Sequence, residues 1–298
     1  EIMPSLVGSE MCIRDRVISS KRKIFNLNLK ELWKYRDLIF LFVKRDFVSK
    51  YKQTVLGPLW AIIQPLFTTL VFTVIFGNLA KLTTMDSINQ EGLVIPSFLF
   101  YMCGNICWAY FSGCLNSCGN TFIGNAGILG KVYFPRLVMP ISVIFSQLIN
   151  FIIQFTMLII FIAYFLIAGT SDLKITVNII MLPILVLQMG LLGMGFGIIV
   201  SALTTKYRDL VMLVGFAVSL WQYATPVAYG LCLIPEEWMG LYKLNPMTMI
   251  VTTFRYSLLG SGSMDWAYYG ISWLVTVIVL AIGVLLFTRV EKTFMDTI

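Results

Sequence analysis

Hydrophobic residues fall into long runs that short polar segments separate. Six runs contain no Asp, Glu, Lys or Arg, and they cover residues 53–80, 92–130, 137–171, 175–205, 210–235 and 266–288. Each is longer than the roughly 20 apolar residues with which a helix crosses a hydrocarbon core about 30 Å thick. Lipid offers the backbone no hydrogen-bond partner, so these runs should be helices, and the short alternating segments of a β-barrel are absent. The pattern predicts an all-α integral membrane protein with six transmembrane helices.

Composition agrees with this fold class. Of the 298 residues, 58% are hydrophobic and 12% are charged, whereas about a quarter of an average soluble domain is charged. We find no linker, repeat or low-complexity segment, so residues 29–298 are expected to form one membrane domain after an N-terminal segment, residues 1–28. Residues 1–16 match nothing that follows and lack the order of a signal peptide. They resemble translated sequencing-adapter readthrough, and we expect them to be non-native.

The distribution of basic residues predicts the orientation. With six spans, 18 of the 22 Lys and Arg residues lie on the side of both termini, and 4 lie on the other side. Positive charge is retained on the cytoplasmic side of membranes, so both termini of this multi-pass protein should be cytoplasmic. The net charge of +7 reports this asymmetry, and no nucleic-acid partner is needed to explain it.

Two segments outside the spans favour further helices. In residues 29–52, apolar side chains recur at helical spacing between basic ones, which predicts an amphipathic helix in the lipid headgroup plane. A plain positive flank explains the same lysines and arginines, and both interpretations can hold. Between the fifth and sixth spans, residues 244–254 are uncharged but too short to cross. Re-entrant or interfacial helices are therefore expected there.

Catalytic chemistry is missing from the sequence. The chain has no His, so it offers no Ser–His or Cys–His pair and no His metal ligand. The nearest approach to a phosphate-binding loop, Gly124 to Lys131, has the wrong spacing. The spans also lack the charged residues that ion-coupled transporters use. We expect no enzyme activity, no cofactor and no metal, with energy supplied by a separate ATPase.

Four cysteines recur within the second span, with the spacing C-x3-C-x6-C-x3-C from Cys103 to Cys118. A metal site is one interpretation. Small polarizable residues that pack against a neighbouring helix are the interpretation that we favour.

Polar uncharged residues interrupt the apolar spans. Gln147, Asn150 and Gln154 form one stripe of the third span. Single amides also occur at Gln64, Asn105, Asn116, Gln188 and Gln222. These side chains either join helices by hydrogen bonds or line a hydrated conduit, on whose wall aromatic residues could stack on sugars. The candidates for such a conduit are Gln147, Asn150, Gln154, Tyr101, Trp108, Trp221 and Tyr223.

Five strings, in order, resemble the type-2 permease family of ABC exporters. Members that export O-antigen, teichoic acid or capsular polysaccharide look most similar. The strings are RDFVSKYKQTVLGPLWAIIQP (45–65), NAGILGKVYFPR (125–136), KYRDL (206–210), TPV with LNP (225–227 and 244–246) and FTRVEKTFMDTI (287–298). Where the family often has Ser-Pro-Val, this chain has Thr-Pro-Val, which keeps the hydroxyl.

The resemblance implies a six-span subunit of the bacterial inner membrane. It forms a homodimer around a conduit and pairs with an ATPase subunit, which binds ATP and Mg. It implies three groups of site residues. The residues that couple to the ATPase would be Asn125, Lys131, Phe134, Pro135, Arg136, Arg208 and Asp209. The interfacial helix and substrate access would use Lys44, Arg45, Asp46, Lys50, Tyr51, Lys52, Gly57 and Trp60. The external gate would contain Thr225, Pro226, Asn245 and Pro246.

The function implied is export of a polyprenyl-diphosphate-linked polysaccharide from the cytoplasm. The cationic rim of Lys44, Arg45, Lys50 and Lys52 would attract the diphosphate, although membrane lipid would bind there equally well. The alternatives are a type-2 permease for drugs or another lipid, a membrane-embedded enzyme acting on lipid-linked sugars, and a membrane scaffold.

Overall fold

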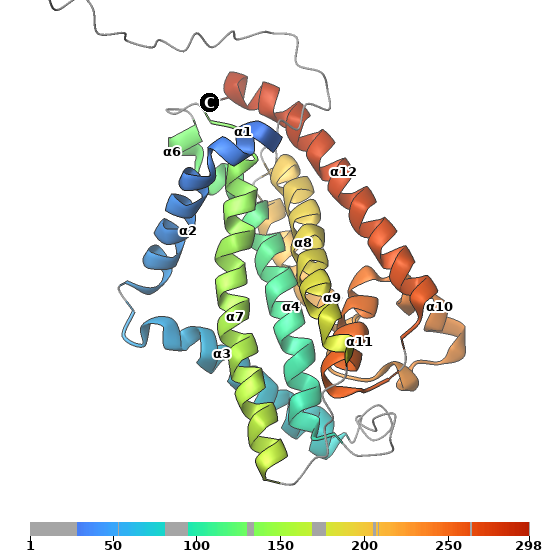
Figure 1. Cartoon of the computed structure of the whole chain (residues 1–298). Coiled ribbons are helices and arrows are strands. Elements are labelled where there is room, and N and C mark those ends of the chain that lie inside the picture. The colour runs from blue at the N-terminus through green and yellow to red at the C-terminus, as the bar shows by residue number, and fades with distance from the viewer. Residues whose placement is uncertain are drawn as a thin grey trace, which may run out of the picture.

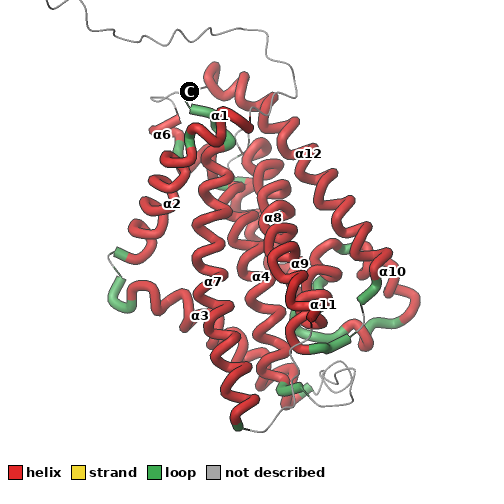
Figure 2. Tube along the Cα trace, viewed as in Figure 1, coloured by secondary structure: helices red, strands yellow, loops and turns green. Residues whose placement is uncertain are grey.

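The computed structural model describes residues 29–52, 54–80, 95–129, 134–168, 177–204, 207, 209–262 and 264–297. These residues form helices joined by turns (Figures 1 and 2), which confirms the all-α class for the described part of the chain. The expected N-terminal segment, residues 1–28, lies outside it. The α-helices are α1 (Leu29–Lys34), α2 (Arg36–Tyr51), α3 (Trp60–Phe72), α4 (Ser97–Gly119), α5 (Thr121–Gly124), α6 (Ala126–Leu129), α7 (Val138–Ile167), α8 (Leu182–Thr204), α9 (Leu210–Tyr223), α10 (Glu236–Leu244), α11 (Pro246–Leu259) and α12 (Trp266–Thr297). A π-helix, η2 (Thr73–Leu79), continues α3, and 3-10 turns cover Gly57–Leu59, Val177–Met181 and Leu231–Leu233.

Five of the six expected spans correspond to helices long and apolar enough to cross a membrane. They are Gly57–Leu79, Ser97–Gly119, Val138–Ile167, Asn178–Thr204 and Trp266–Thr288.

The run 210–235 differs from the other five. Its helix, α9, has 14 residues, or about 21 Å at 1.5 Å per residue, which is shorter than a hydrocarbon core of about 30 Å. Turns follow at residues 224–229, so α9 does not cross such a core as a straight helix. Six spans therefore stays a prediction.

Helix α4 forms the centre of the bundle and packs against α3, α7, α8 and α11. Its closest approach is to α8, where glycines meet cysteines. A Cβ added to Gly193 would lie 2.7 Å from the Cβ of Cys114, and one added to Gly197 would lie 2.5 Å from that of Cys118. Small residues at such contacts let membrane helices approach closely. The cysteine stripe is thus part of the helix packing, as expected.

Helix α2 packs along α7 and inclines away from it in Figure 1. The expected apolar face does not form one surface, because Val43 and Tyr51 are buried whereas Phe40 is 72% exposed. The buried side also includes Phe42, whose ring lies 5.8 Å from that of Phe134. Some apolar side chains of α2 therefore pack on the bundle, whereas Phe40 and its exposed neighbours stay on the outer surface of the protein.

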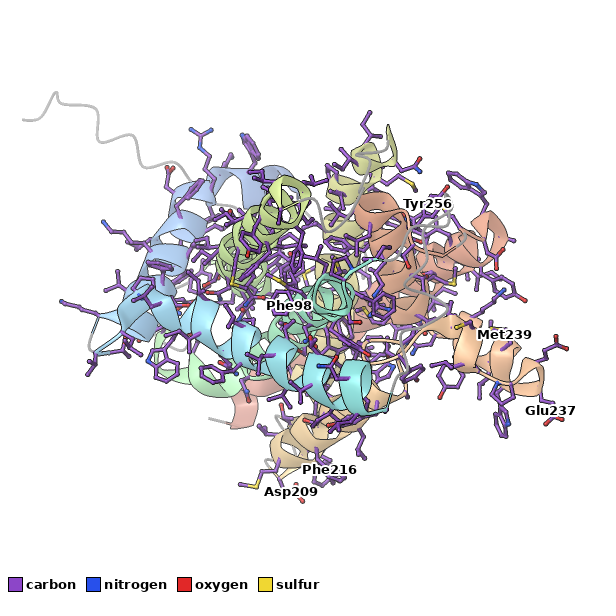
Figure 3. All side chains as sticks on the ribbon, turned by 90° about the horizontal axis from the view of Figure 1, so that it is seen from below. Phe98, Asp209, Phe216, Glu237, Met239 and Tyr256 are labelled. Atoms are coloured by element: carbon purple, nitrogen blue, oxygen red, sulfur yellow. The ribbon has the colours of Figure 1, made fainter. Side chains whose placement is uncertain are left out.

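The two ends of the bundle differ. In Figure 1, α1, α6 and the C-terminal part of α12 lie at one end, and α10 and α11 lie in the opposite half. Helix α11 is buried along most of its length against α4, α8 and α12. Asn245 caps it, its Oδ1 accepting from the Met247 N–H at 3.2 Å, and Pro246 occupies the first turn, where no donor is lost. Figure 3, which views the bundle from this half, shows Glu237 of α10 at the periphery.

Candidate functional site

A polar cavity of about 440 Å³ lies among α2, α3, α4, α7 and α9. Most of its polar lining consists of amides and hydroxyls from four of these helices. They are Gln64, Thr68, Asn105, Ser112, Asn116, Gln147, Asn150, Gln154, Ser219 and Gln222. Among the residues that line the cavity, Lys50 carries the one formal charge. The cavity therefore offers many neutral donors and acceptors inside a bundle that is otherwise apolar.

The stripe of α7 connects three helices through hydrogen bonds. The Tyr51 hydroxyl donates to Asn150 Oδ1 at 2.7 Å, and Asn150 Nδ2 donates to Gln147 Oε1 at 3.0 Å. Gln147 Nε2 then donates to Ser117 Oγ at 2.9 Å. Gly113 lets Gln147 approach, because an added Cβ would lie 3.0 Å from Gln147 Oε1. The stripe therefore joins helices and also lines the cavity. Its role as the wall of a conduit stays a prediction.

Four amides that the sequence shows only as single residues lie in the same lining, and they are Gln64, Asn105, Asn116 and Gln222. Asn105 Nδ2 donates to Thr69 Oγ1 at 3.2 Å, and its Oδ1 has no hydrogen-bond partner among the described residues. Gln188 lies elsewhere, donating to Ser272 between α8 and α12 at 2.8 Å. The sequence signal that could have indicated these four lining residues was the presence of an amide side chain in a helix otherwise made largely of apolar residues.

One of the four aromatic conduit candidates, Trp108, lines the cavity. Tyr101 is fully buried and packs edge-on against Phe72. Trp221 packs against Trp108 at 6.1 Å between ring centroids, and Tyr223 is 58% exposed. Tyr101 and Trp221 therefore pack between helices and Tyr223 lies on the outer surface, and none of the three lines this cavity.

Lys50, Tyr51 and Trp60 lie on the side of the cavity next to α2. Desolvation lowers the pKa of the Lys50 ammonium and raises the pKa of the Tyr51 hydroxyl. The Lys50 ammonium lies 5.5 Å from the centre of the Tyr51 ring. Lys44 and Lys52 are exposed. Gly57 has φ 51°, a conformation that glycine adopts readily, and it sets the turn from α2 into α3.

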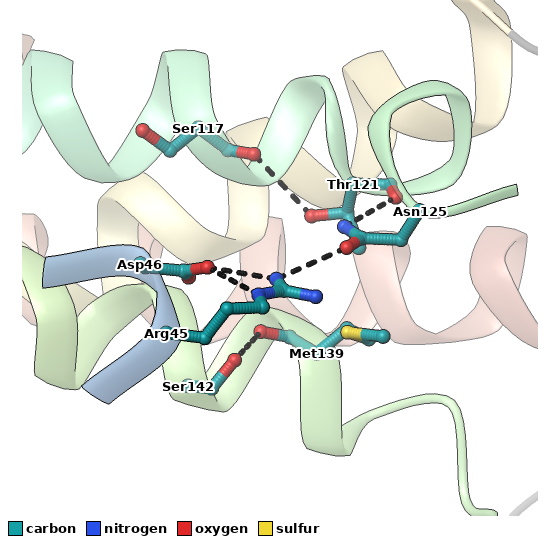
Figure 4. Close-up of polar contacts among 7 residues, drawn as sticks. All are labelled: Arg45, Asp46, Ser117, Thr121, Asn125, Met139 and Ser142. Carbon is teal, nitrogen blue, oxygen red and sulfur yellow. Dashed lines mark hydrogen bonds and ion pairs between the residues drawn. The ribbon is translucent and has the colours of Figure 1, made fainter. Parts of the chain in front are cut away.

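Two groups of residues that the sequence places apart meet beside the middle of α2. Arg45 donates to Asp46 Oδ1 at 2.7 Å and to Asn125 Oδ1 at 3.1 Å (Figure 4). The Arg45 guanidinium also lies 4.9 Å from the centre of the Phe42 ring, which packs on Phe134. Helix α2 is thus tied to the segment that contains α5 and α6.

The remaining described coupling candidates lie just before α7 and α9. Arg136 is 9% exposed and Pro135 precedes α7. Asp209 is exposed, precedes α9 and projects at the edge of the bundle in Figure 3. Lys131 and Arg208 lie outside the described residues.

The four external-gate candidates lie close together. Asn245 Nδ2 donates to Thr225 Oγ1 at 3.1 Å. The Pro246 carbonyl accepts from Ser272 Oγ at 3.0 Å, and the Pro226 carbonyl accepts from a buried arginine at 2.6 Å. That arginine, Arg255, is one of the four basic residues that the charge count places in external loops, and no spacing signal marks it.

Comparison with known proteins identifies the family. The ABC-2 type transporter family matches residues 37–259. The chain belongs to this family. The match runs from α2 to the end of α11 and so includes the polar cavity and the Arg45–Asn125 contact.

Several curated relatives are named as permeases. The chain is 25% identical over 261 residues to the O-antigen export system permease protein RfbA of Klebsiella pneumoniae, covering 87% of this chain and 94% of the relative. It is 29% identical over 231 residues to the protein of the same name from Myxococcus xanthus, covering 76% and 82%. A shorter match of 31% over 64 residues joins it to the inner membrane transport permease YadH of Escherichia coli K12, covering 22% and 25%.

Proposed function

We propose that this chain is the membrane subunit of an exporter that moves a lipid-linked polysaccharide outward, powered by a separate ATPase. The observation that carries the proposal is the polar cavity, which has about 440 Å³ and a lining rich in neutral amides. Relatives over most of the chain are named as O-antigen export permeases.

The chemistry of the cavity suits a glycan. Sugar hydroxyls both donate and accept hydrogen bonds, as the amides of this lining do. Trp108 and Trp60 add aromatic side chains to the same lining. A neutral wall would hold an anionic chain less tightly than a ring of cations would, so the polymer could move.

The α2 side of the cavity suits the diphosphate of the lipid-linked substrate. Lys50 is the formal charge of the lining, and Lys44 and Lys52 are exposed on the same helix and its end. A Lys ammonium binds phosphate as a point charge. We infer that the diphosphate binds here while the lipid chain stays in the bilayer.

The end that carries α1, α6 and the end of α12 would face the cytoplasm and the ATPase (Figure 1). Both termini would then be cytoplasmic, with α9 and the residues after it together crossing the membrane. The Arg45–Asn125 contact would carry movement of the α5–α6 segment into α2. A second copy of the chain would complete the conduit, as the family resemblance implies.

A permease for a hydrophobic drug or another lipid is the second candidate. The observation that favours it is a groove of about 760 Å³ between α7 and α8, lined largely by apolar side chains.

The test is stimulation of ATP hydrolysis. The chain would be purified with the ATPase that co-purifies with it, reconstituted in liposomes, and given a short polyprenyl-diphosphate glycan or a panel of hydrophobic drugs. We expect the glycan to raise turnover. Stimulation by drugs alone would favour the second candidate, and ATP turnover by the purified chain without its partner would contradict the division of labour.

A further inference from the structure

Arg255 is a buried cation in the gate region. It lies on α11 and is 2% exposed. An isolated charge in such surroundings is very costly, so a buried guanidinium needs several acceptors. Backbone carbonyls of the described residues accept from Arg255: its Nε donates to the Phe100 carbonyl at 3.2 Å, its Nη1 to that of Pro226 at 2.6 Å, and its Nη2 to that of Val227 at 2.7 Å.

These acceptors come from two other elements. Phe100 belongs to α4, and Pro226 and Val227 belong to the turn that follows α9. The planar guanidinium also lies 3.7 Å from the centre of the Phe100 ring, within the distance of a cation–π contact. One side chain of α11 therefore holds the end of α9 against α4.

Glycine at position 104 makes room for this arrangement. A Cβ added to Gly104 would lie 2.5 Å from Arg255 Nη2 and 3.0 Å from the Val227 carbonyl oxygen. The first contact is closer than real Cβ atoms come to another heavy atom. Helix α4, the turn and α11 thus form a cradle that fits the guanidinium.

The turn is placed where a gate would act. It follows directly on α9, whose Ser219 and Gln222 line the polar cavity, and its Thr225 accepts from Asn245 at the start of α11. The geometry points to Arg255 as a positioning residue that keeps this turn closed on α4. This inference rests on the proposed export function for the meaning of the gate, although its test does not need a substrate.

The mechanism follows from the contacts. Moving the turn away from α4 breaks hydrogen bonds to a charged donor inside a buried site, and these are stronger than bonds between neutral groups. These hydrogen bonds therefore oppose any movement that would open the turn. Opening requires α11 and the turn to move together, or the carbonyls to find new donors.

The test measures how fast a buried thiol in the turn reacts. Ala228 is 3% exposed, and Ala228→Cys would be made in the full chain with Cys12→Ser and Cys232→Ser. The matched control is Ala202→Cys on α8, where the alanine is 8% exposed, in the same background. Both proteins would be placed in nanodiscs, which expose both faces, and treated with a maleimide.

Arg255→Lys should raise labelling at position 228 by about tenfold, because a point charge cannot replace the planar fork that reaches several carbonyls. Gly104→Ala should raise it as well, since the new Cβ displaces Nη2. The double variant should react more slowly than the product of the two single effects predicts, because the contact with Nη2 is then absent and only the contact with the Val227 carbonyl oxygen remains. Labelling at position 202 should stay unchanged in every variant.

Three outcomes would overturn the inference. They are unchanged labelling at position 228, an equal rise at positions 228 and 202, and strictly additive effects of the two substitutions. If Arg255→Lys does not fold, Gly104→Ala alone still decides between local and general loosening. A failed gate test with glycan-stimulated ATP hydrolysis intact would remove the role of Arg255 and leave the proposed function standing.

Discussion

The Arg45–Asn125 hydrogen bond is expected to transmit movement from the ATPase side into the cavity wall. We consider the substitutions Arg45→Lys and Asn125→Ala, singly and together. The N···O distance is 3.1 Å, and the Arg45 side chain is 39% exposed. Hydrogen bonds to charged groups contribute up to about 3 kcal/mol, and exposure reduces that contribution to about 1 kcal/mol. A loss of this size corresponds to about a fivefold effect.

The assay is the amount of glycan exported per ATP hydrolysed in liposomes that hold the permease and its ATPase. Each single variant should lower this ratio about fivefold, because about 1 kcal/mol of coupling is lost. The double variant should be no worse, since both changes remove the same contact. The matched control is Arg36→Lys on the same helix, where the arginine side chain is 59% exposed. Additive effects, or an equal loss in the control, would refute the assignment.

Three further substitutions test the packing of α4 on α8, the polar cavity, and the turn between α2 and α3. Gly197→Val should lower the stability of the folded bundle by about 1–3 kcal/mol through overpacking, since an added Cβ would lie 2.5 Å from a cysteine Cβ of α4. The size-exclusion profile should show aggregated protein. Gly215→Ala is the control, because the space around Gly215 is open, and it should leave the profile unchanged. Asn150→Leu should reduce export while ATPase binding persists in pull-downs, because the substitution removes the hydrogen bond between α2 and α7 and the one from Asn150 to Gln147. Equal loss in Ile152→Leu, on the exposed face of α7, would argue against the cavity. Gly57→Ala should lower the melting temperature through about 1 kcal/mol of backbone strain at φ 51°, and an unchanged melting temperature would contradict that reason.

The sequence predicted the helical class and most of the spans because charge is excluded from lipid at every position of a span. The same rule treated residues 210–235 as one span, because no charged residue marks the turn that the chain makes near Pro226 and Gly230. Helix α9 therefore ends at Tyr223.

The stripe of α7 was predictable because Gln147, Asn150 and Gln154 share one helical face. The rest of the cavity was not, because Gln64 and Gln222 come from helices that only the tertiary fold brings together. Arg45 and Asn125 were each selected from a separate string, and neither string specified their contact. Arg255 was counted as a charge of an external loop, and its burial depends on carbonyls that its own segment does not contain.

Photocrosslinking from the cavity tests the central claim most directly. A photoreactive amino acid would replace Gln222, which lines the cavity, or Ile160, which is 63% exposed on α7. Both would be made in cells that synthesise a radiolabelled lipid-linked glycan and contain the ATPase. The account predicts glycan crosslinked from position 222 and much less from position 160. No crosslink from position 222, or equal crosslinking from both positions, would contradict it.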